Sequence, residues 1–255
     1  MCALFLASFV LTTALESLGP PAALADAPMS ISPIALTVEP TARAASMTIR
    51  NPSSDPLRLQ IGIERWSPTP SNPYALTPAN DVIVFPQLVT IPMFGRQEIR
   101  VAVLGVPPPA ERAYRIVVTP LPPLNSAAAA GGRLSAALEL QARFTFPVFV
   151  EPALAQTRGT FTQLHVAHGV LAIRIQNDGN VHLGGEPLTI VARGADGRTI
   201  ASQEARGWSV LAAHTTTVSV KPNRCAGVRS LTVSAPASMN VREKTVEVSS
   251  RDCGS

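Results

Sequence analysis

Histidines, cysteines and scattered carboxylates are the residues of this chain that could support chemistry. His165 and His168 are close enough in sequence for two imidazoles to share a metal ion. No acidic residue or cysteine stands near them at ligand spacing, so we expect both histidines at the surface or at strand ends. The other two histidines are His182 and His214. The sequence therefore predicts no metal site.

The chain also lacks the local patterns that mark common active sites. It has no G-x-S-x-G elbow, Walker loop, G-x-G-x-x-G or H-E-x-x-H sequence. Its carboxylates are dispersed and form no pair suited to acid–base catalysis. The sequence predicts a protein that is not an enzyme and that needs no cofactor.

Residues 1–25 have the pattern of a secretory signal peptide. An apolar run from Ala3 to Leu15 precedes the small-x-small site Ala23–Ala25. A membrane anchor, the alternative, would need about 20 apolar residues, and this run is shorter. We expect a mature chain that begins at Asp26 and is not stably inserted in a membrane.

Two cysteines remain after this leader, because Cys2 lies within it. Cys225 and Cys253 are an even pair in an exported chain, which favours a disulfide. The bond would close a loop of about 28 residues and stabilise the C-terminal region by about 3–4 kcal/mol. The alternative is a pair of inert thiols.

The charge distribution indicates no nucleic-acid partner. The formal net charge is +4, but the basic residues are scattered singly and form no run. Such a distribution gives general solubility and a weak attraction to acidic partners. We expect no binding to nucleic acid.

The most informative element is a long segment in which apolar and polar residues alternate. The alternation runs from Leu138 to Phe146 within an extended stretch from Leu134 to Val150, and period two is typical of a half-buried strand. Such a stretch could span about 55 Å, whereas a strand usually has about five or six residues. A strand of this length could pair with something besides its own sheet. Its apolar positions are Leu138, Leu140, Ala142, Phe144 and Phe146.

Strand patterns recur along the whole chain and are separated by turns rich in Pro, Gly and Asn. Leu57–Trp66 alternates before a Pro-rich loop, and Leu171–Gln176 alternates before the turn Asn177–Gly179. No segment has a sustained helical period, and strands spaced by about 8 to 12 residues are typical of β-sandwiches. We expect two all-β domains, at residues 26–152 and 153–255.

The order of these segments resembles that of the periplasmic pilus-assembly chaperones of the chaperone–usher pathway. The resemblance covers most of the mature chain, and no single piece of it is diagnostic. The matching pieces are Ile34–Pro40, Ser46–Asn51, Leu57–Trp66, Val82–Val103, Tyr114–Pro123, Leu138–Pro152, Ile173–Asn177 and Val210–Val220.

The resemblance implies two immunoglobulin-like β-sandwich domains, arranged as an L or boomerang with a cleft between them. It implies a periplasmic chaperone whose partners are pilus or fimbrial subunits and an outer-membrane usher. The last strand of the first domain would complete a subunit that lacks a strand, which is a known form of β-strand addition. The five alternating apolar residues would fill the groove of the subunit. The alternative is that they face this protein's own core, and both can hold along one strand.

The basic anchor of that family has no counterpart at the aligned positions. Typical members place an arginine in the first strand and a lysine near the end of the donor strand, and the two bind the terminal carboxylate of the subunit. The aligned positions here are Ala35 or Leu36, and Pro147. The remaining candidates are Arg43, Arg115 and Arg143, the last on the donor strand itself.

Two other functions fit the sequence less well. One is a secreted two-domain immunoglobulin-like component of a surface fibre, such as an adhesin. That component would normally carry a free N-terminal donor extension, and the segment before Ile31 is short. The other is an enzyme on a β-sandwich, which would need the catalytic cluster that the sequence lacks.

Overall fold

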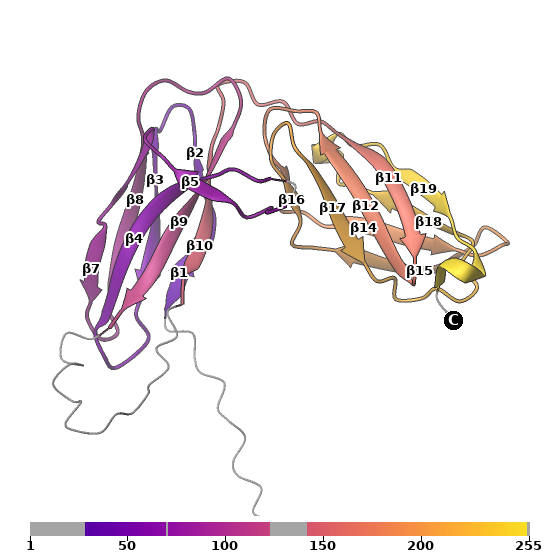
Figure 1. Ribbon diagram of the computed structural model, residues 1–255, viewed down its shortest axis with the longest axis horizontal. Coiled ribbons are helices and arrows are strands. Elements are labelled where there is room, and N and C mark those ends of the chain that lie inside the picture. The colour runs from indigo at the N-terminus through magenta and orange to yellow at the C-terminus, as the bar shows by residue number, and fades with distance from the viewer. Residues whose placement is uncertain (1–28, 70, 123–141, 254–255) are drawn as a thin grey trace, which may run out of the picture.

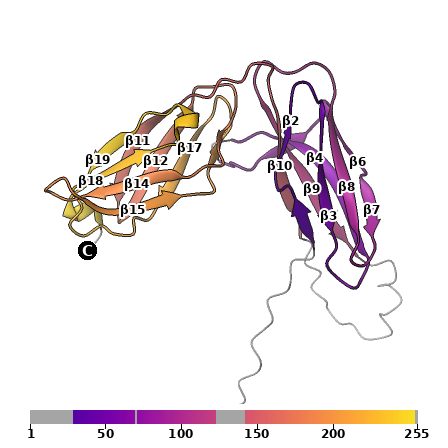
Figure 2. The ribbon, with the colours of Figure 1, turned by 180° about the vertical axis from the view of Figure 1, so that it is seen from behind.

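The computed structural model describes residues 29–69, 71–122 and 142–253. Within these ranges the chain forms two β-sandwiches that meet at an angle, the first with β1 to β10 and the second with β11 to β19 (Figures 1 and 2). The predicted all-β class with two angled domains is confirmed. The predicted leader lies outside the described residues, and the boundary at residue 152 stays a prediction.

The first domain consists of two sheets packed face to face. One sheet has the order β1-β3-β8-β6, and the other has the order β2-β10-β9-β4-β5, with β7 also paired to β4. The strands are β1 (Ser30–Ser32), β2 (Leu36–Val38), β3 (Ala44–Arg50), β4 (Leu57–Trp66), β5 (Leu76–Pro78), β6 (Val82–Phe85), β7 (Leu88–Ile91), β8 (Arg96–Val103), β9 (Arg112–Leu121) and β10 (Phe144–Val150).

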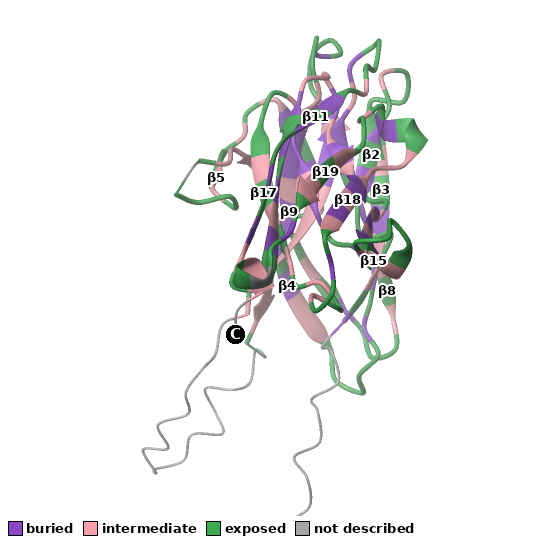
Figure 3. Cartoon of the chain, turned by 90° about the vertical axis from the view of Figure 1, so that its right-hand side faces the viewer, coloured by how far each residue is buried: buried purple, intermediate pink, exposed green. Residues whose placement is uncertain are grey.

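Alternate residues of both sheets point inward and form one apolar core. In β3, Met47 and Ile49 are buried while Ser46 and Arg50 are exposed, as the pleat of a strand requires. Tyr114 of β9 is the largest side chain that is fully buried. Figure 3 shows buried segments along the strands and exposed ones in the loops.

The second domain has a three-stranded sheet in the order β11-β12-β17, a four-stranded sheet in the order β15-β14-β18-β19, and a short pair, β13-β16. No helix in the described part of the chain is long and apolar enough to span a membrane. The elements are β11 (Gly159–Ala167), β12 (Val170–Asn177), β13 (Leu183–Gly184), β14 (Leu188–Arg193), β15 (Thr199–Ala205), β16 (Ser209–Val210), β17 (Thr215–Val220), β18 (Ser230–Ser234), β19 (Lys244–Glu247) and the 3-10 helices η2 (Ala237–Met239) and η3 (Ser250–Cys253).

A buried asparagine closes the end of one strand in each domain. Asn51 follows β3, and its Nδ2 donates to the carbonyl of Ile91 at 3.2 Å. Asn177 ends β12, and its Nδ2 donates to the carbonyl of Val210 at 3.0 Å. Both stand where the sequence indicates turns, because an Asn side chain can bond backbone groups that no strand reaches.

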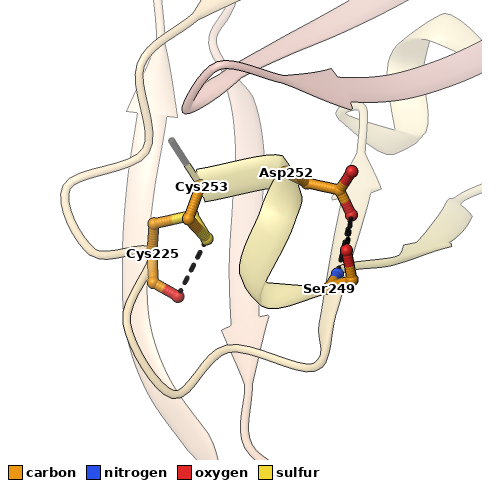
Figure 4. The surroundings of a disulfide bond; sticks show 4 residues. All are labelled: Cys225, Ser249, Asp252 and Cys253. Atoms are coloured by element: carbon orange, nitrogen blue, oxygen red, sulfur yellow. Dashed lines mark hydrogen bonds between the residues drawn. A yellow bond between two sulfur atoms is a disulfide. The ribbon is translucent and has the colours of Figure 1, made fainter. Parts of the chain in front are cut away.

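A disulfide joins Cys225 to Cys253 near the C-terminus (Figure 4). It links the loop before β18 to η3, and the Cα atoms lie 5.7 Å apart. The Asp252 carboxylate holds the start of the same turn, since it accepts hydrogen bonds from the Ser249 backbone N–H at 2.7 Å and hydroxyl at 2.8 Å. The bond therefore constrains the end of the chain against its own domain.

Replacing both cysteines by serine should lower the free energy of unfolding by about 3–4 kcal/mol, because the unfolded chain would lose a cross-link over a loop of about 28 residues. Urea unfolding followed by circular dichroism measures the change. Reductant should destabilise the wild-type chain and leave the double variant unaffected. Equal midpoints for the oxidised wild type and the variant would contradict this.

Candidate functional site

The last strand of the first domain is paired on both sides along only part of its length. β10 pairs with β9 from Phe144 to Val150, but β2 joins its other side only from Val148 to Val150. The edge from Phe144 to Pro147 therefore has no partner strand among the described residues. The free N–H and C=O groups of such an edge are a template for another strand.

This strand begins later than the alternation predicted. Ala142 and Arg143 precede β10 and are not part of it. If the register with β9 continued, Ala142 would face Pro120, and a proline has no N–H to extend the ladder. The predicted plug residues Leu138 and Leu140 lie outside the described residues.

The predicted plug residues on β10 contact this protein's own core. Phe144 and Phe146 are half-buried and pack against the core of the first domain. Val148 and Val150 continue the same face and are buried. Burial thus decreases along the strand towards the open edge. The aromatic rings belong to the core and still expose surface, so this placement is compatible with both predicted roles.

The opposite face of β10 lies beside an arginine that the sequence could not place. Arg115 stands on β9 directly across from Pro147. Its guanidinium carbon lies 4.0 Å from the ring centroid of Trp66 and 5.8 Å from that of Tyr74. Its Nη1 donates to Thr145 Oγ1 at 3.3 Å, whereas its buried Nε has no hydrogen-bond partner in the described ranges.

The Arg115 guanidinium is a cation that is ready to bind an anion. Burial lowers the pKa of Arg115, and Tyr74 opposes that shift. The group stays charged because arginine titrates far above neutral pH. No acidic side chain of residues 29–69, 71–122 or 142–253 lies within ion-pair distance of it. A partly desolvated cation that lacks an acidic partner favours a carboxylate.

The other basic candidates have partners or lie elsewhere. Arg143 forms an ion pair with Glu64, and 52% of its side chain is exposed. Arg43 is exposed and donates to a loop carbonyl. Of the two aligned first-strand positions, Leu36 is buried in the core and Ala35 is exposed. Arg115 is therefore the basic residue that the structure places nearest to the aligned position on the donor strand.

A polar network supports the start of β9, next to Arg115. The Asp81 Oδ2 atom accepts hydrogen bonds of 2.7 Å from Arg65, Arg112 and the Tyr114 hydroxyl. Burial alone would raise the pKa of Asp81, but the hydrogen bonds from Tyr114 and Arg65 outweigh it and lower that pKa. Burial, with the bond to Asp81, raises the pKa of Tyr114 to about 12. The Asp81 carboxylate is thus ionised, and it accepts hydrogen bonds from three residues of two strands.

The four histidines lie on different elements and do not form a cluster. His165 lies on β11, His168 in the turn after it and His214 in the loop before β17. The described residues contain no group of three or more His, Cys, Asp or Glu side chains that could hold a metal ion. His182, which the sequence did not single out, contacts Glu111 across the junction between the domains.

The sequence of the first domain matches a known family. A model of the family described as pili and flagellar-assembly chaperone, PapD N-terminal domain, matches residues 28–156. The chain belongs to this family. The matched region includes every strand of the first domain and thus the open edge of β10. The expected chaperone function is confirmed, and a fibre component is not favoured.

Solved structures of pilus chaperones share this fold at low sequence identity. The YadV chaperone matches at 14% identity and a TM-score of 0.53, over 87% of this chain and 100% of that chain. The CsuC–CsuE chaperone–tip adhesion subunit complex of Acinetobacter baumannii matches at 15% identity and a TM-score of 0.51, over 87% of this chain and 98% of that chain. The SafA pilin–SafB chaperone complex of Salmonella enterica matches at 12% identity and a TM-score of 0.52, over 86% of this chain and 96% of that chain. No curated protein matches the sequence.

Removing the Asp81 charge should destabilise the chaperone. Asp81→Asn should cost about 1.5–3 kcal/mol at neutral pH, because hydrogen bonds to a charged group are lost. Since folding lowers the pKa of Asp81, its contribution is present above the unfolded pKa and disappears as the pH falls through the folded one. The difference between wild type and variant should therefore shrink below about pH 4.

Urea unfolding of both proteins between pH 3 and about pH 7 measures this dependence. Asp55→Asn is the matched control, because the Asp55 side chain is exposed and should change stability by less than about 0.5 kcal/mol. A stability difference for Asp81→Asn that stays constant with pH would show that the charge does not support the network.

Proposed function

We propose that this pilus-assembly chaperone binds fibre subunits by lending them the open edge of β10, and that it passes them to an outer-membrane usher. The observation that carries the proposal is the edge from Phe144 to Pro147, which is paired on one side only. A subunit that lacks a strand has the complementary defect, an unpaired edge beside an apolar groove. Adding the strand would satisfy both edges.

The apolar side chains of the strand would fill the groove of the subunit. The proposed residues are Leu138, Leu140, Ala142, Phe144 and Phe146. Phe144 and Phe146 expose part of their surface, so they can contact a subunit without leaving their own domain. Burying such a side chain contributes about 1.5–3 kcal/mol. Binding of this kind needs no nucleotide, because strand pairing and subunit folding supply the free energy.

The terminal carboxylate of the subunit would bind at Arg115. Typical members of the family carry a lysine where this chain has Pro147, and Arg115 lies directly across from that residue. A cation thus occupies the same region of the sheet but comes from the neighbouring strand. Trp66 holds the guanidinium in place, and a guanidinium can donate charge-assisted hydrogen bonds to a carboxylate. Arg143, the candidate that the sequence placed on the donor strand itself, is the weaker choice because Glu64 neutralises it.

We also propose that residues 1–25 direct export and that the chaperone acts in the periplasm. A disulfide between Cys225 and Cys253 fits an oxidising compartment, since such bonds persist there and are rare in the cytosol. The usher would take the subunit when a strand of the next subunit replaces β10.

Leu140→Asp should abolish retention of a subunit, because it would bring an uncompensated charge into an apolar groove. Gln141→Asp is the matched control, since Gln141 belongs to the polar set of the alternation. Each variant is co-expressed with a fibre subunit of the same bacterium, and the soluble complex is quantified by co-purification, with circular dichroism to check the fold. Equal retention by the two variants would overturn donor-strand binding.

Arg115→Met keeps an unbranched side chain beside Trp66 and removes the cation. The affinity for the subunit should fall about 10- to 100-fold, because charge-assisted hydrogen bonds contribute about 1.5–3 kcal/mol. Arg143→Met is the control and should weaken binding by less than about five-fold, as expected for an exposed ion pair. Calorimetry with the purified subunit measures both.

A subunit whose C-terminal carboxylate is amidated provides a second test of the contact between Arg115 and that carboxylate. It should bind the wild-type chaperone as weakly as the native subunit binds Arg115→Met. Full affinity of Arg115→Met for the native subunit would exclude Arg115 as the anchor, whatever the result for the donor strand.

A further inference from the structure

Two residues of the first domain contact one residue of the second domain where β10 meets the second domain. His182 stands just before β13, Phe149 lies in β10 and Glu111 stands just before β9. The His182 and Phe149 rings are stacked, with centroids 3.7 Å apart and an interplanar angle of 10°. His182 Nδ1 lies 2.7 Å from Glu111 Oε2, and the His182 backbone N–H donates to Glu111 Oε1 at 3.0 Å.

The Glu111 carboxylate depends on this contact. Only 2% of its side chain is exposed, and a buried charge is costly unless it is paired. The neighbouring Arg112 directs its guanidinium to Asp81 instead. Among the described residues, no lysine or arginine lies within ion-pair distance of Glu111. One residue of the second domain therefore satisfies a buried group of the first.

The remaining apolar contact around this joint is small. Ala113, Phe149 and Leu211 form a buried cluster, and Trp66 packs against it. The Glu111 backbone N–H also donates to the carbonyl of Asn180 at 2.8 Å. Domains joined by a small interface move relative to each other by default. The His182 contacts therefore oppose such motion together with Asn180, whose Nδ2 also donates to the carbonyl of Pro109 at 3.2 Å.

We propose that His182 is a positioning residue for subunit binding: it clamps the end of β10 against the second domain and so fixes the angle between the domains. Phe149, on which it stacks, is on the same face of β10 as Pro147 and only two residues from it, a distance of about 7 Å along a strand. The clamp thus lies next to the open edge and to Arg115. The binding part of this inference rests on the proposed function of that edge.

The effect of His182 on the angle between the two domains is tested first, without any subunit. Small-angle X-ray scattering of the full chain should give a narrow pair-distance distribution for wild type and a broader one with a larger radius of gyration for His182→Ala. His182→Asn should restore much of the wild-type curve, because its amide can donate to Glu111 from near the position of Nδ1. His165→Ala is the control, as His165 is exposed on β11, and should leave the curve unchanged.

Subunit binding is tested next, by calorimetry with a purified fibre subunit. If the angle that binds is populated about one tenth of the time in His182→Ala, the apparent affinity falls about ten-fold, and His182→Asn recovers most of it. Thermal melts of both domains confirm that the variants are folded.

The outcomes separate the two proposals. Unchanged scattering for His182→Ala would overturn the clamp. A changed angle with unchanged subunit affinity would overturn the positioning role. A wild-type chain that binds no subunit would instead refute the proposed function of β10, while the scattering result would still decide whether His182 fixes the angle.

Discussion

The short parallel contact between β2 and β10 is the constraint on which the rest of the site depends. The first segment of the chain serves both sheets: β1 pairs with β3 in one sheet, and β2 pairs with β10 in the other. The chain crosses between the sheets at residues 33–35, so only three residues remain to cover β10. Since β2 is this short, the strand keeps an unpaired edge from Phe144 to Pro147.

That edge has different neighbours on its two faces. The inner face carries Phe144 and Phe146, which are half-buried against the core. The outer face leads past Thr145 and Arg115 to Phe149 at the domain junction. One strand of seven residues therefore connects a pairing edge, an apolar surface, a cation and the second domain.

Much of the fold could be predicted from the sequence because strands have a simple period. The alternation of Leu57–Trp66 predicted β4, and the proline and asparagine signals predicted where strands end. The alternating segment was predicted less well at Ala142 and Arg143, which precede the strand. In the structure the strand starts at Phe144, and no local pattern in residues 134–143 predicts that start.

The place of Arg115, the proposed anchor, could not be predicted, because it depends on register between strands that are far apart in sequence. Pro147 marked a missing lysine, but only the pairing of β9 with β10 brings Arg115 beside it. The contact between His182 and Glu111 joins residues 71 apart and had no signal in composition or spacing.

The sequence by itself determined the periodicity, the turns and the family, since these are recorded in neighbouring residues. Tertiary structure alone decided which edge stays open, which half-buried arginine has no acidic partner among the described residues, and which histidine contacts both domains. Those outcomes depend on register and on packing between distant segments, because the fold determines which side chains lose water and which keep a free hydrogen bond.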